Sequence, residues 1–513
     1  MAHRASIVVV GGGLAGLSAA VEALHQTRSI PGATVALLEK EPRTGGNSAK
    51  ASSGINGVLT RTQREQGIVD SVGAFVHDTV ASGRGLSNET LVQKLVDDST
   101  DAVGWLQQVF SLDLDVLTQL GGHSVPRTHR RPDVNGKPQP VGWGIVSTLT
   151  KYLDEQAQGD SPRFRLLTSA RVTELIVAEN GRVAGTVYEA ADPKAQDRGQ
   201  HKLHSDVVIL ATGGFAGEGG RSGFLSKYAP QLVGLPATNG AFATGDGLRL
   251  ATEVGAELVD MDQVQVHPTG FVKASDQGNP TKFLAAEALR GEGGILLDGR
   301  GRRFVNELDT RDRVSDAIFK SCSADDTRAR HHKAATGDGP AAAAFLLLSQ
   351  AAADAFGHGS LGFYEKMGLV SRAADISQLA ADLNVNPDVL QQTLRDYDKI
   401  RHGGTLDEFG KSTFPVAMLN PEPPGSAQYF WAVVTPSIHY TMGGVRFDAG
   451  GRVLRASDQA PIPGLLAAGE VTGGLHGANR LGGNSLLECV VFGREAGRQA
   501  AAVALGQRPP RSA

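Results

Sequence analysis

The sequence predicts an α/β fold in which parallel strands and helices alternate, and a few segments carry this prediction. The β-branched run Ser6–Val10 is followed by a glycine cluster, by a helical stretch from Leu14 to about His25, and by a second apolar run, Thr34–Leu38. Strand, glycine turn, helix and strand in this order form a βαβ unit, which requires a parallel sheet. Two later runs, Val207–Leu210 and Gly464–Ala468, are predicted as further buried strands.

The glycine cluster after the first strand has the spacing of a dinucleotide-binding turn. Gly11–Gly16 fits G-x-G-x-x-G between a strand and a helix. In this pattern Gly11 permits a tight turn, Gly13 lets a pyrophosphate approach, and Gly16 allows the helix to pack closely on the strand. Glu39 ends the second strand, where a carboxylate can accept a hydrogen bond from a ribose hydroxyl and disfavours a 2′-phosphate. The pattern predicts a dinucleotide site, and both NAD and FAD satisfy it.

The other elements follow from hydrophobic periodicity and turn residues. Asn180-Gly181 is a hairpin turn signal, Asn386-Pro387 can open a helix, and Asn484 or Ser485 can cap one. In chain order we expect an amphipathic helix over residues 90–120, an antiparallel hairpin over Phe164–Glu189, surface loops at 272–281 and 321–340, two helices between Asp375 and Asp398, and a long helix over Ser485–Leu505.

The composition of the 513-residue chain excludes several classes of protein. Lys and Arg number 50 against 54 Asp and Glu, a net charge of −4, so no basic field points to nucleic acid or an anionic membrane. Two cysteines exclude a disulfide scaffold or a cysteine-rich metal cluster, and no metal is expected. The longest apolar run, Ala341–Leu348, is too short to span a membrane. We expect a soluble cytoplasmic protein without a membrane partner, and an organellar location stays open.

Glycine, with 65 residues, gathers in further clusters that follow strands. These clusters form the motifs Thr44-Gly45-Gly46-Asn47-Ser48, Ala211-Thr212-Gly213-Gly214, Thr244-Gly245-Asp246-Gly247, Ala468-Gly469-Glu470-Val471 and Asn479-Arg480-Leu481-Gly482-Gly483-Asn484-Ser485-Leu486. With these motifs the chain resembles flavoproteins of the fumarate reductase and succinate dehydrogenase family over nearly its whole length. The resemblance implies a Rossmann-type, glutathione reductase-like FAD-binding domain formed by residues 1–261 and 440–513. It also implies an inserted α+β clamp domain, residues 262–439, that closes over the isoalloxazine.

The resemblance also implies how FAD is held. Glu470 binds the ribityl chain, and residues 483–487 wrap the isoalloxazine, where the positive end of the following helix can stabilise a reduced ring. Membrane-bound members attach FAD to a histidine after the second strand, but no histidine lies within residues 41–56, so non-covalent FAD is expected. The implied FAD contacts are Gly11, Gly13, Leu14, Ala15, Gly16, Glu39, Lys40, Gly46, Asn47, Ser48, Ser53, Gly54, Val172, Ala211, Thr212, Gly213, Thr244, Asp246, Gly469, Glu470, Gly483, Ser485, Leu486 and Leu487.

Two histidines and an arginine match the family's positions that hold a substrate carboxylate. His267, with Thr269, stands in His-Pro-Thr-Gly, and His439 stands in His-Tyr-Thr-Met-Gly-Gly. Arg480 is the third, and its planar fork suits a bidentate carboxylate. The paired histidines favour a dicarboxylate substrate, fumarate or succinate.

A second group of charges matches the family's acid–base machinery. Glu287 and Arg290 are three residues apart, about one helical turn, so they can pair. Spacing alone would indicate only a surface ion pair. The resemblance instead implies that Arg311 is the general acid and receives protons through Arg290 and Glu287. Hydride from flavin N5 would go to one alkene carbon and a proton from Arg311 to the other, which makes the expected function a soluble fumarate reductase.

Other functions on the same scaffold remain as alternatives. Ala286 stands where several bacterial members have a threonine, and the segment Phe283–Ala286 is similar to soluble fumarate reductases of yeasts and other fungi. The alternatives are a reductase of urocanate or acrylates, an L-aspartate oxidase-like enzyme, a ketosteroid dehydrogenase, which would lack the arginine relay, and a catalytically silent flavin electron carrier. No C-x-x-C-H motif occurs, so no haem domain is expected. Electrons would come from free reduced flavin, NADH or an unidentified partner.

Overall fold

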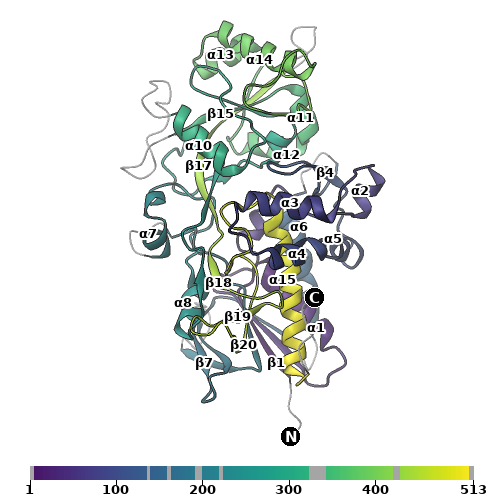
Figure 1. Cartoon of the computed structure of the whole chain (residues 1–513), viewed down its shortest axis with the longest axis vertical. Helices are drawn as coiled ribbons and strands as arrows, with labels where there is room; N and C mark the ends of the chain where they lie inside the picture. The colour runs from purple at the N-terminus through teal and green to yellow at the C-terminus, as the bar shows by residue number, and fades with distance from the viewer. Residues whose placement is uncertain are drawn as a thin grey trace.

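The computed structural model of the chain describes residues 5–135, 139–158, 163–190, 199–218, 223–322, 342–419 and 428–507. The molecule is elongated, with α1 (Leu14–Gln26) and α15 (Asn484–Ala504) in one half and α13 (Ile376–Leu383) and α14 (Pro387–Arg401) at the opposite end (Figure 1). The long strand β17, Tyr429–Thr441, runs between the two halves. Each half is built on its own large sheet.

A six-stranded sheet forms the first half, in the order β19-β20-β10-β1-β2-β6. Neighbouring strands from β20 to β6 are parallel, and only the edge strand β19 is antiparallel to its neighbour. The predicted α/β fold with a parallel sheet is therefore confirmed. The strands are β1 (Ser6–Val10), β2 (Thr34–Leu38), β6 (Phe164–Leu167), β10 (Val207–Leu210), β19 (Arg452–Leu454) and β20 (Pro461–Ala467).

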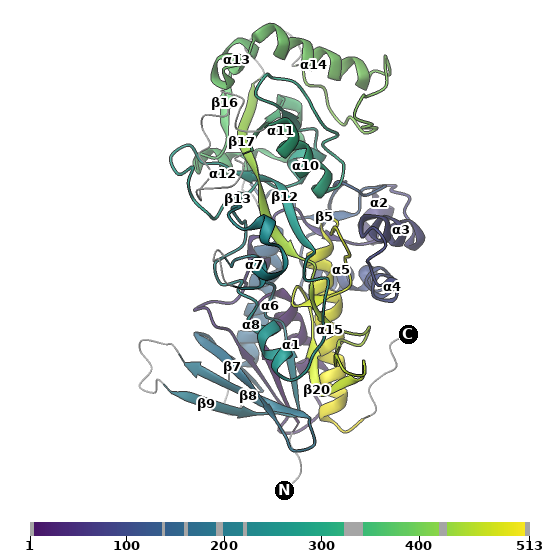
Figure 2. The same cartoon turned by 60° about the vertical axis from the view of Figure 1, so that its left-hand side comes forward.

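The segment predicted as one hairpin divides between two sheets. Its first run, β6, pairs with β2 in the parallel sheet. Only β7 (Ala170–Val177) and β8 (Val183–Ala190) form the hairpin, and β8 pairs onward with β9 (Gln200–His204) (Figure 2). The division follows from Ser169, which turns the chain between β6 and β7 in the left-handed region at φ 51°.

Helices α1 and α15 pack closely beside the parallel sheet, and glycine makes this approach possible. A Cβ added at Gly493 would lie 2.5 Å from the carbonyl oxygen of Ala15, and one added at Gly497 would lie 2.5 Å from that of Ala19. No side chain fits in such a space. The last long helix therefore completes the core around the first one.

The start of α15 differs from the sequence prediction. Its N-cap is Gly483, in the left-handed region at φ 82°, and not Asn484 or Ser485. The Asn484 side chain is buried and its Oδ1 accepts a hydrogen bond from Asn56 Nδ2 at 2.7 Å. That contact occupies the side chain, so it does not cap the helix.

An antiparallel sheet forms the second half, in the order β13-β12-β17-β15-β14, with β16 also paired to β17. Helices α10 to α14 surround it, and α13 and α14 confirm the two helices predicted between Asp375 and Asp398. The bounds are β12 (Val264–Phe271), β13 (Phe283–Leu284), β14 (Ile295–Leu297), β15 (Ala344–Leu348), β16 (Ser371–Ala373), α9 (Ala288–Gly291), α10 (Arg311–Ser321), α11 (Gln350–Phe356) and α12 (His358–Lys366).

The single helix predicted over residues 90–120 is two helices and a strand, α4 (Glu89–Asp97), α5 (Ser99–Gln108) and β4 (Val116–Thr118). The loop predicted at 272–281 is confirmed, and the one at 321–340 lies outside the described residues from 323 onward.

Within the described ranges, no helix has the length and apolar character needed to cross a bilayer. The remaining elements are β3 (Ile55–Asn56), α2 (Arg61–Glu65), α3 (Val72–Ser82), β5 (Thr128–Arg130), α6 (Val141–Gln156), α7 (Phe224–Tyr228), α8 (Asp246–Glu253), β11 (Leu258–Val259), β18 (Gly444–Arg446), β21 (Thr472–Gly473) and two short 3₁₀ helices, Ser48–Lys50 and Pro230–Leu232.

Candidate functional site

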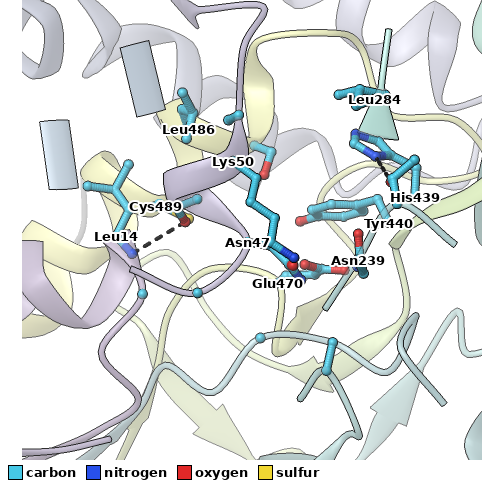
Figure 3. Close-up of a pocket in the computed structure, with 18 of the residues that line it drawn as sticks. Leu14, Asn47, Lys50, Asn239, Leu284, His439, Tyr440, Glu470, Leu486 and Cys489 are labelled. Atoms are coloured by element: carbon cyan, nitrogen blue, oxygen red, sulfur yellow. Dashed lines mark hydrogen bonds between the residues drawn. The ribbon is translucent and has the colours of Figure 1, made fainter. Parts of the chain in front are cut away.

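A cavity of about 650 Å³ lies at the carboxyl ends of the parallel strands and extends to the second half. Val10, Leu38, Ala211 and Ala468 line it where β1, β2, β10 and β20 end. Ligands of open parallel sheets bind at this edge. Figure 3 shows Leu14 and Cys489 on one side of the cavity and Leu284 and His439 on the other, with Asn47 and Glu470 between them. The cavity thus has one end at the glycine turn after β1 and another end formed by the antiparallel sheet.

The three motif glycines after β1 differ in what surrounds them. A Cβ added at Gly11 would lie 2.3 Å from the Ala211 carbonyl oxygen, and Gly11 has φ +107°. One added at Gly16 would lie 1.9 Å from the carbonyl oxygen of Gly11. At Gly13, in contrast, the nearest atom would be Ser48 Oγ at 4.0 Å. Gly11 and Gly16 are therefore needed for packing, whereas Gly13 leaves open space in the cavity.

Glu39 and Lys40 follow β2 and also line the cavity. Glu39 Oε2 accepts a hydrogen bond from the Gly12 N–H at 2.6 Å, and burial raises the pKa of its carboxyl. Lys40 Nζ donates to Asp246 Oδ2 at 2.7 Å and to Thr244 Oγ1 at 3.0 Å. Five residues from three separate segments of the chain are thus brought together.

Arg311 lies at the opposite end of the cavity, as the first residue of α10. Its Nε and Nη2 lie 2.7 and 2.6 Å from Glu287 Oε2, and its Nη1 donates to Gln265 Oε1 at 2.8 Å. The other oxygen of Glu287 accepts from the Gly121 N–H at 2.8 Å. Burial alone raises the pKa of Glu287, but the charges of Arg311 and Arg290 and these hydrogen bonds hold it at about 2. Glu287 is therefore ionised at neutral pH.

Gln265 links Arg311 to a second arginine. Its Oε1 also accepts from Arg480 Nη2 at 3.1 Å, and its Nε2 donates to the Arg480 carbonyl at 2.7 Å. The Arg480 guanidinium carbon lies 4.4 Å from the centre of the Tyr440 ring. Burial and then the charge of Arg311 lower the pKa of Arg480 to about 10, so Arg480 remains positive at neutral pH. A single amide oxygen thus fixes the spacing of two positive side chains.

Arg290 does not make the ion pair with Glu287 that the spacing predicted. Glu287 occupies the N-cap position of the four-residue helix α9, and its side chain turns toward Arg311. The Nη1 of Arg290 instead donates to the carbonyl of Glu307. Nε and Nη2 of Arg290 have no hydrogen-bond partner among the described residues. Burial lowers the pKa of Arg290, although the charge of Glu287 opposes that shift, so the two groups still influence each other.

His267 and His439 lie together, with ring centroids 5.0 Å apart. His439 lines the cavity, and its Nδ1 is 2.6 Å from Thr238 Oγ1. His267 is fully buried, and its Nδ1 accepts from the Thr269 N–H at 3.2 Å. Neither His267 nor Thr269 is among the residues that line the cavity. Of the predicted substrate contacts, His439 and Arg480 therefore face the cavity directly.

Comparison with known proteins agrees with this geometry. A family model described as an FAD binding domain matches residues 6–486. The chain is 42% identical over 500 residues to fumarate reductase 1 of Saccharomyces cerevisiae, which covers 96% of this chain and 97% of that protein. The chain belongs to the FAD-binding flavoprotein family that includes the fumarate reductases.

Further flavoproteins of the family match over similar lengths. The fumarate reductase of Schizosaccharomyces pombe is 38% identical over 508 residues, 98% of this chain and 91% of that protein. Among solved structures, the open conformation of a flavocytochrome c3 fumarate reductase matches with a TM-score of 0.70 and 33% identity, over 98% of this chain and 79% of that one. The predicted family and the predicted cofactor, FAD, are confirmed, and the chain is an FAD-dependent oxidoreductase.

The residues at the nucleotide end fit FAD. Open space lies beside Gly213 as it does beside Gly13, because a Cβ added at Gly213 would meet nothing within 4 Å. Both glycines line the cavity. A pyrophosphate needs such room beside bare backbone. The predicted FAD contacts all line the cavity except Gly16, Thr244, Gly469 and Leu487.

Several residues around the cavity were absent from the sequence prediction. Asn239, Tyr364 and Tyr440 line it, Gln265 accepts a hydrogen bond from Arg311, and Thr238 lies against His439. Only Tyr440 had a signal, since it stands beside His439 in a family motif. The others belong to no glycine-rich motif, so only the folded chain identifies them.

The two histidines should make the protein less stable in acid. Burial and the charge of Arg311 hold the pKa of each well below 6.5. As the pH falls below about 6.5, the unfolded chain binds protons at these positions and the folded chain does not, so the free energy of unfolding decreases. We expect the Tm of His439→Gln to fall less than that of the wild type between pH 7 and pH 5. Parallel Tm curves would contradict this assignment.

Proposed function

We propose that this oxidoreductase acts on a carbon–carbon double bond and reduces fumarate to succinate. The observation that carries the proposal is the cluster at the second end of the cavity. There Arg311, paired to Glu287, and Arg480 meet at one glutamine oxygen, with His439 on the same wall. A compact dianion fits this concentration of positive charge and hydrogen-bond donors.

Binding of the two carboxylates is assigned to the histidines and Arg480. His439 and Arg480 face the cavity, and His267, with Thr269, supports His439. The histidines are neutral at pH 7, because their pKa values lie well below 6.5, so each has one ring N–H that can donate a hydrogen bond. Donors on the carboxylates also stabilise the negative charge that develops on the substrate during reduction.

Arg311 is proposed to deliver the proton. FAD, held non-covalently by the residues at the glycine-turn end of the cavity, would supply the hydride to one alkene carbon. Arg311 then gives a proton to the other carbon, and Glu287, held ionised beside it, stabilises the guanidinium and passes the replacement proton. Arg290 is proposed as the entry to this relay, because its charge acts on Glu287 and two of its nitrogens carry no hydrogen bond among the described residues.

The proposed domains are an FAD-binding domain of residues 1–261 and 440–513 and a clamp domain of residues 262–439. The distribution of the two sheets supports this division. All strands of the parallel sheet come from the first set of residues, and the antiparallel sheet comes from residues 264–441. The proposed substrate end of the cavity lies where the two meet, so closure of the clamp would exclude water from it.

A stopped-flow experiment tests the function. The protein is reduced anaerobically, by NADH or by free reduced flavin, and mixed with fumarate, urocanate, acrylate or oxygen. We expect the flavin absorbance to return fastest with fumarate and succinate to form in equal amount. Faster return with urocanate or acrylate would assign another acid, return with oxygen alone would indicate an oxidase, and no return would indicate an electron carrier.

A further inference from the structure

The positive charge of Arg480 has no carboxylate in direct contact among the described residues, although its side chain is buried. Nη1 donates to the Leu481 carbonyl at 3.0 Å and Nη2 to Gln265 Oε1 at 3.1 Å, whereas Nε has no partner within the described ranges. A buried charge is costly unless it is compensated. A negative charge that offsets the charge of Arg480 must therefore lie farther away and act without direct contact with the guanidinium.

The Tyr440 side chain is in direct contact with the Arg480 guanidinium, and no carboxylate of the described residues makes such a contact. Its ring lies against the guanidinium, and its hydroxyl donates a hydrogen bond to Glu488 Oε1. The other oxygen of Glu488 lies 2.6 Å from His476 Nε2. Tyr440, Glu488 and His476 are all buried, and they come from β17, from α15 and from the segment before α15.

This chain of contacts has a clear electrostatic effect. A phenol that donates to a carboxylate gains electron density, which strengthens the attraction between its ring face and a cation. Burial and Arg311 lower the pKa of Arg480, and its interactions with Tyr440, Glu488 and Glu470 oppose that lowering. Of these groups, Glu488 is the carboxylate that is joined to the guanidinium by an unbroken series of contacts, through the Tyr440 hydroxyl and ring.

We infer that Glu488 is a positioning residue that acts through Tyr440 to keep Arg480 charged, oriented and free to bind a substrate carboxylate. A carboxylate in direct contact with Arg480 would occupy the guanidinium fork that the substrate needs. The aromatic ring separates the counter-charge from the fork, so the N–H groups remain available. This inference rests on the proposed function, because it takes a carboxylate as the ligand of Arg480.

The test compares Glu488→Gln, Tyr440→Phe and the wild type as FAD-loaded proteins. Binding of malonate, a dicarboxylate that is not reduced, is followed by the change in flavin absorbance, and fumarate turnover is measured separately. We expect both variants to raise the malonate Kd and the fumarate KM by about tenfold, an effect within the range of a desolvated cation–π contact, and to change kcat by less than about threefold. Glu495→Gln is the matched control, because Glu495 is a buried glutamate two turns later on α15 and does not line the cavity.

A double-mutant cycle separates positioning from a merely structural effect. In an Arg480→Met background, Glu488→Gln should change the malonate Kd by less than about twofold, because the group it supports is gone. An equal loss in both backgrounds, a Kd unchanged in both single variants, or a wild type that binds no malonate would overturn the inference. If Glu488→Gln does not fold, Tyr440→Phe decides alone. A wild type that binds malonate but reduces no fumarate would contradict the proposed function and leave this inference to be decided by the binding data.

Discussion

Replacement of Arg311 by alanine is expected to lower kcat for fumarate reduction by about 10³-fold, within the range that general acids contribute. The side chain faces the cavity and is held by Glu287 and Gln265, so its loss removes the proposed proton donor and breaks both contacts. The FAD content should stay close to that of the wild type, because Arg311 lies at the opposite end of the cavity from the glycine turn. Turnover with fumarate under anaerobic conditions, together with flavin absorbance, measures both quantities.

Arg313→Ala provides the control for this experiment. Arg313 stands two residues later on α10, its side chain is 64% exposed, and it pairs only with Asp309 among the described residues. Such a surface pair contributes little to stability. We expect nearly full activity in Arg313→Ala. Equal losses in the two variants would mean that α10 as a whole is disturbed, and no loss in Arg311→Ala would remove Arg311 from the mechanism.

A valine at Gly13 is expected to abolish FAD binding while the chain still folds. The open space beside Gly13 accepts a side chain in the absence of cofactor, since an added Cβ would be 4.0 Å from its nearest neighbour. The same space is where the pyrophosphate must approach the backbone. We expect the FAD dissociation constant to rise by about 100-fold or more, which corresponds to about 2.7 kcal/mol. Flavin content after purification and titration with FAD check this result.

Gly73→Val is the comparison for Gly13→Val. Gly73 lies on α3, and a Cβ added there would meet nothing within 4 Å, but it does not line the cavity. Both variants should show the secondary structure of the wild type by circular dichroism. If Gly13→Val retained its flavin, the phosphate would have to lie elsewhere.

The sequence predicted best those features that depend on neighbours in the chain. The strand Ser6–Val10, the following helix and the strand Thr34–Leu38 have the predicted bounds to within a residue or two, because periodicity and glycine spacing are local signals. The pairing of Glu287 with Arg290 was predicted from the same kind of spacing and was wrong. Helix α9 begins only after Glu287, so the spacing rule did not apply to its side chain.

The role of Gln265 could not be predicted from local sequence patterns. Its side-chain oxygen accepts from Arg311, 46 residues away, and from Arg480, 215 residues away. No residue spacing in the sequence indicates that three segments so far apart come into contact. Resemblance identified both arginines, because their motifs are distinctive, but the glutamine between them became visible only when the chain was folded.

The packing of α15 against α1 has a consequence for how the protein is made. The ribosome synthesises α1 and the first strands early, but β20 and α15, which complete the same sheet and core, emerge more than 400 residues later in a 513-residue chain. Contacts so distant in sequence form slowly, and until they form the early apolar surfaces stay exposed. The nucleotide end of the cavity is bounded by Ala468, Ser485 and Leu486 as well as by Gly11 and Gly13. We therefore expect the chain to take up its cofactor late in folding, once its last long helix has docked.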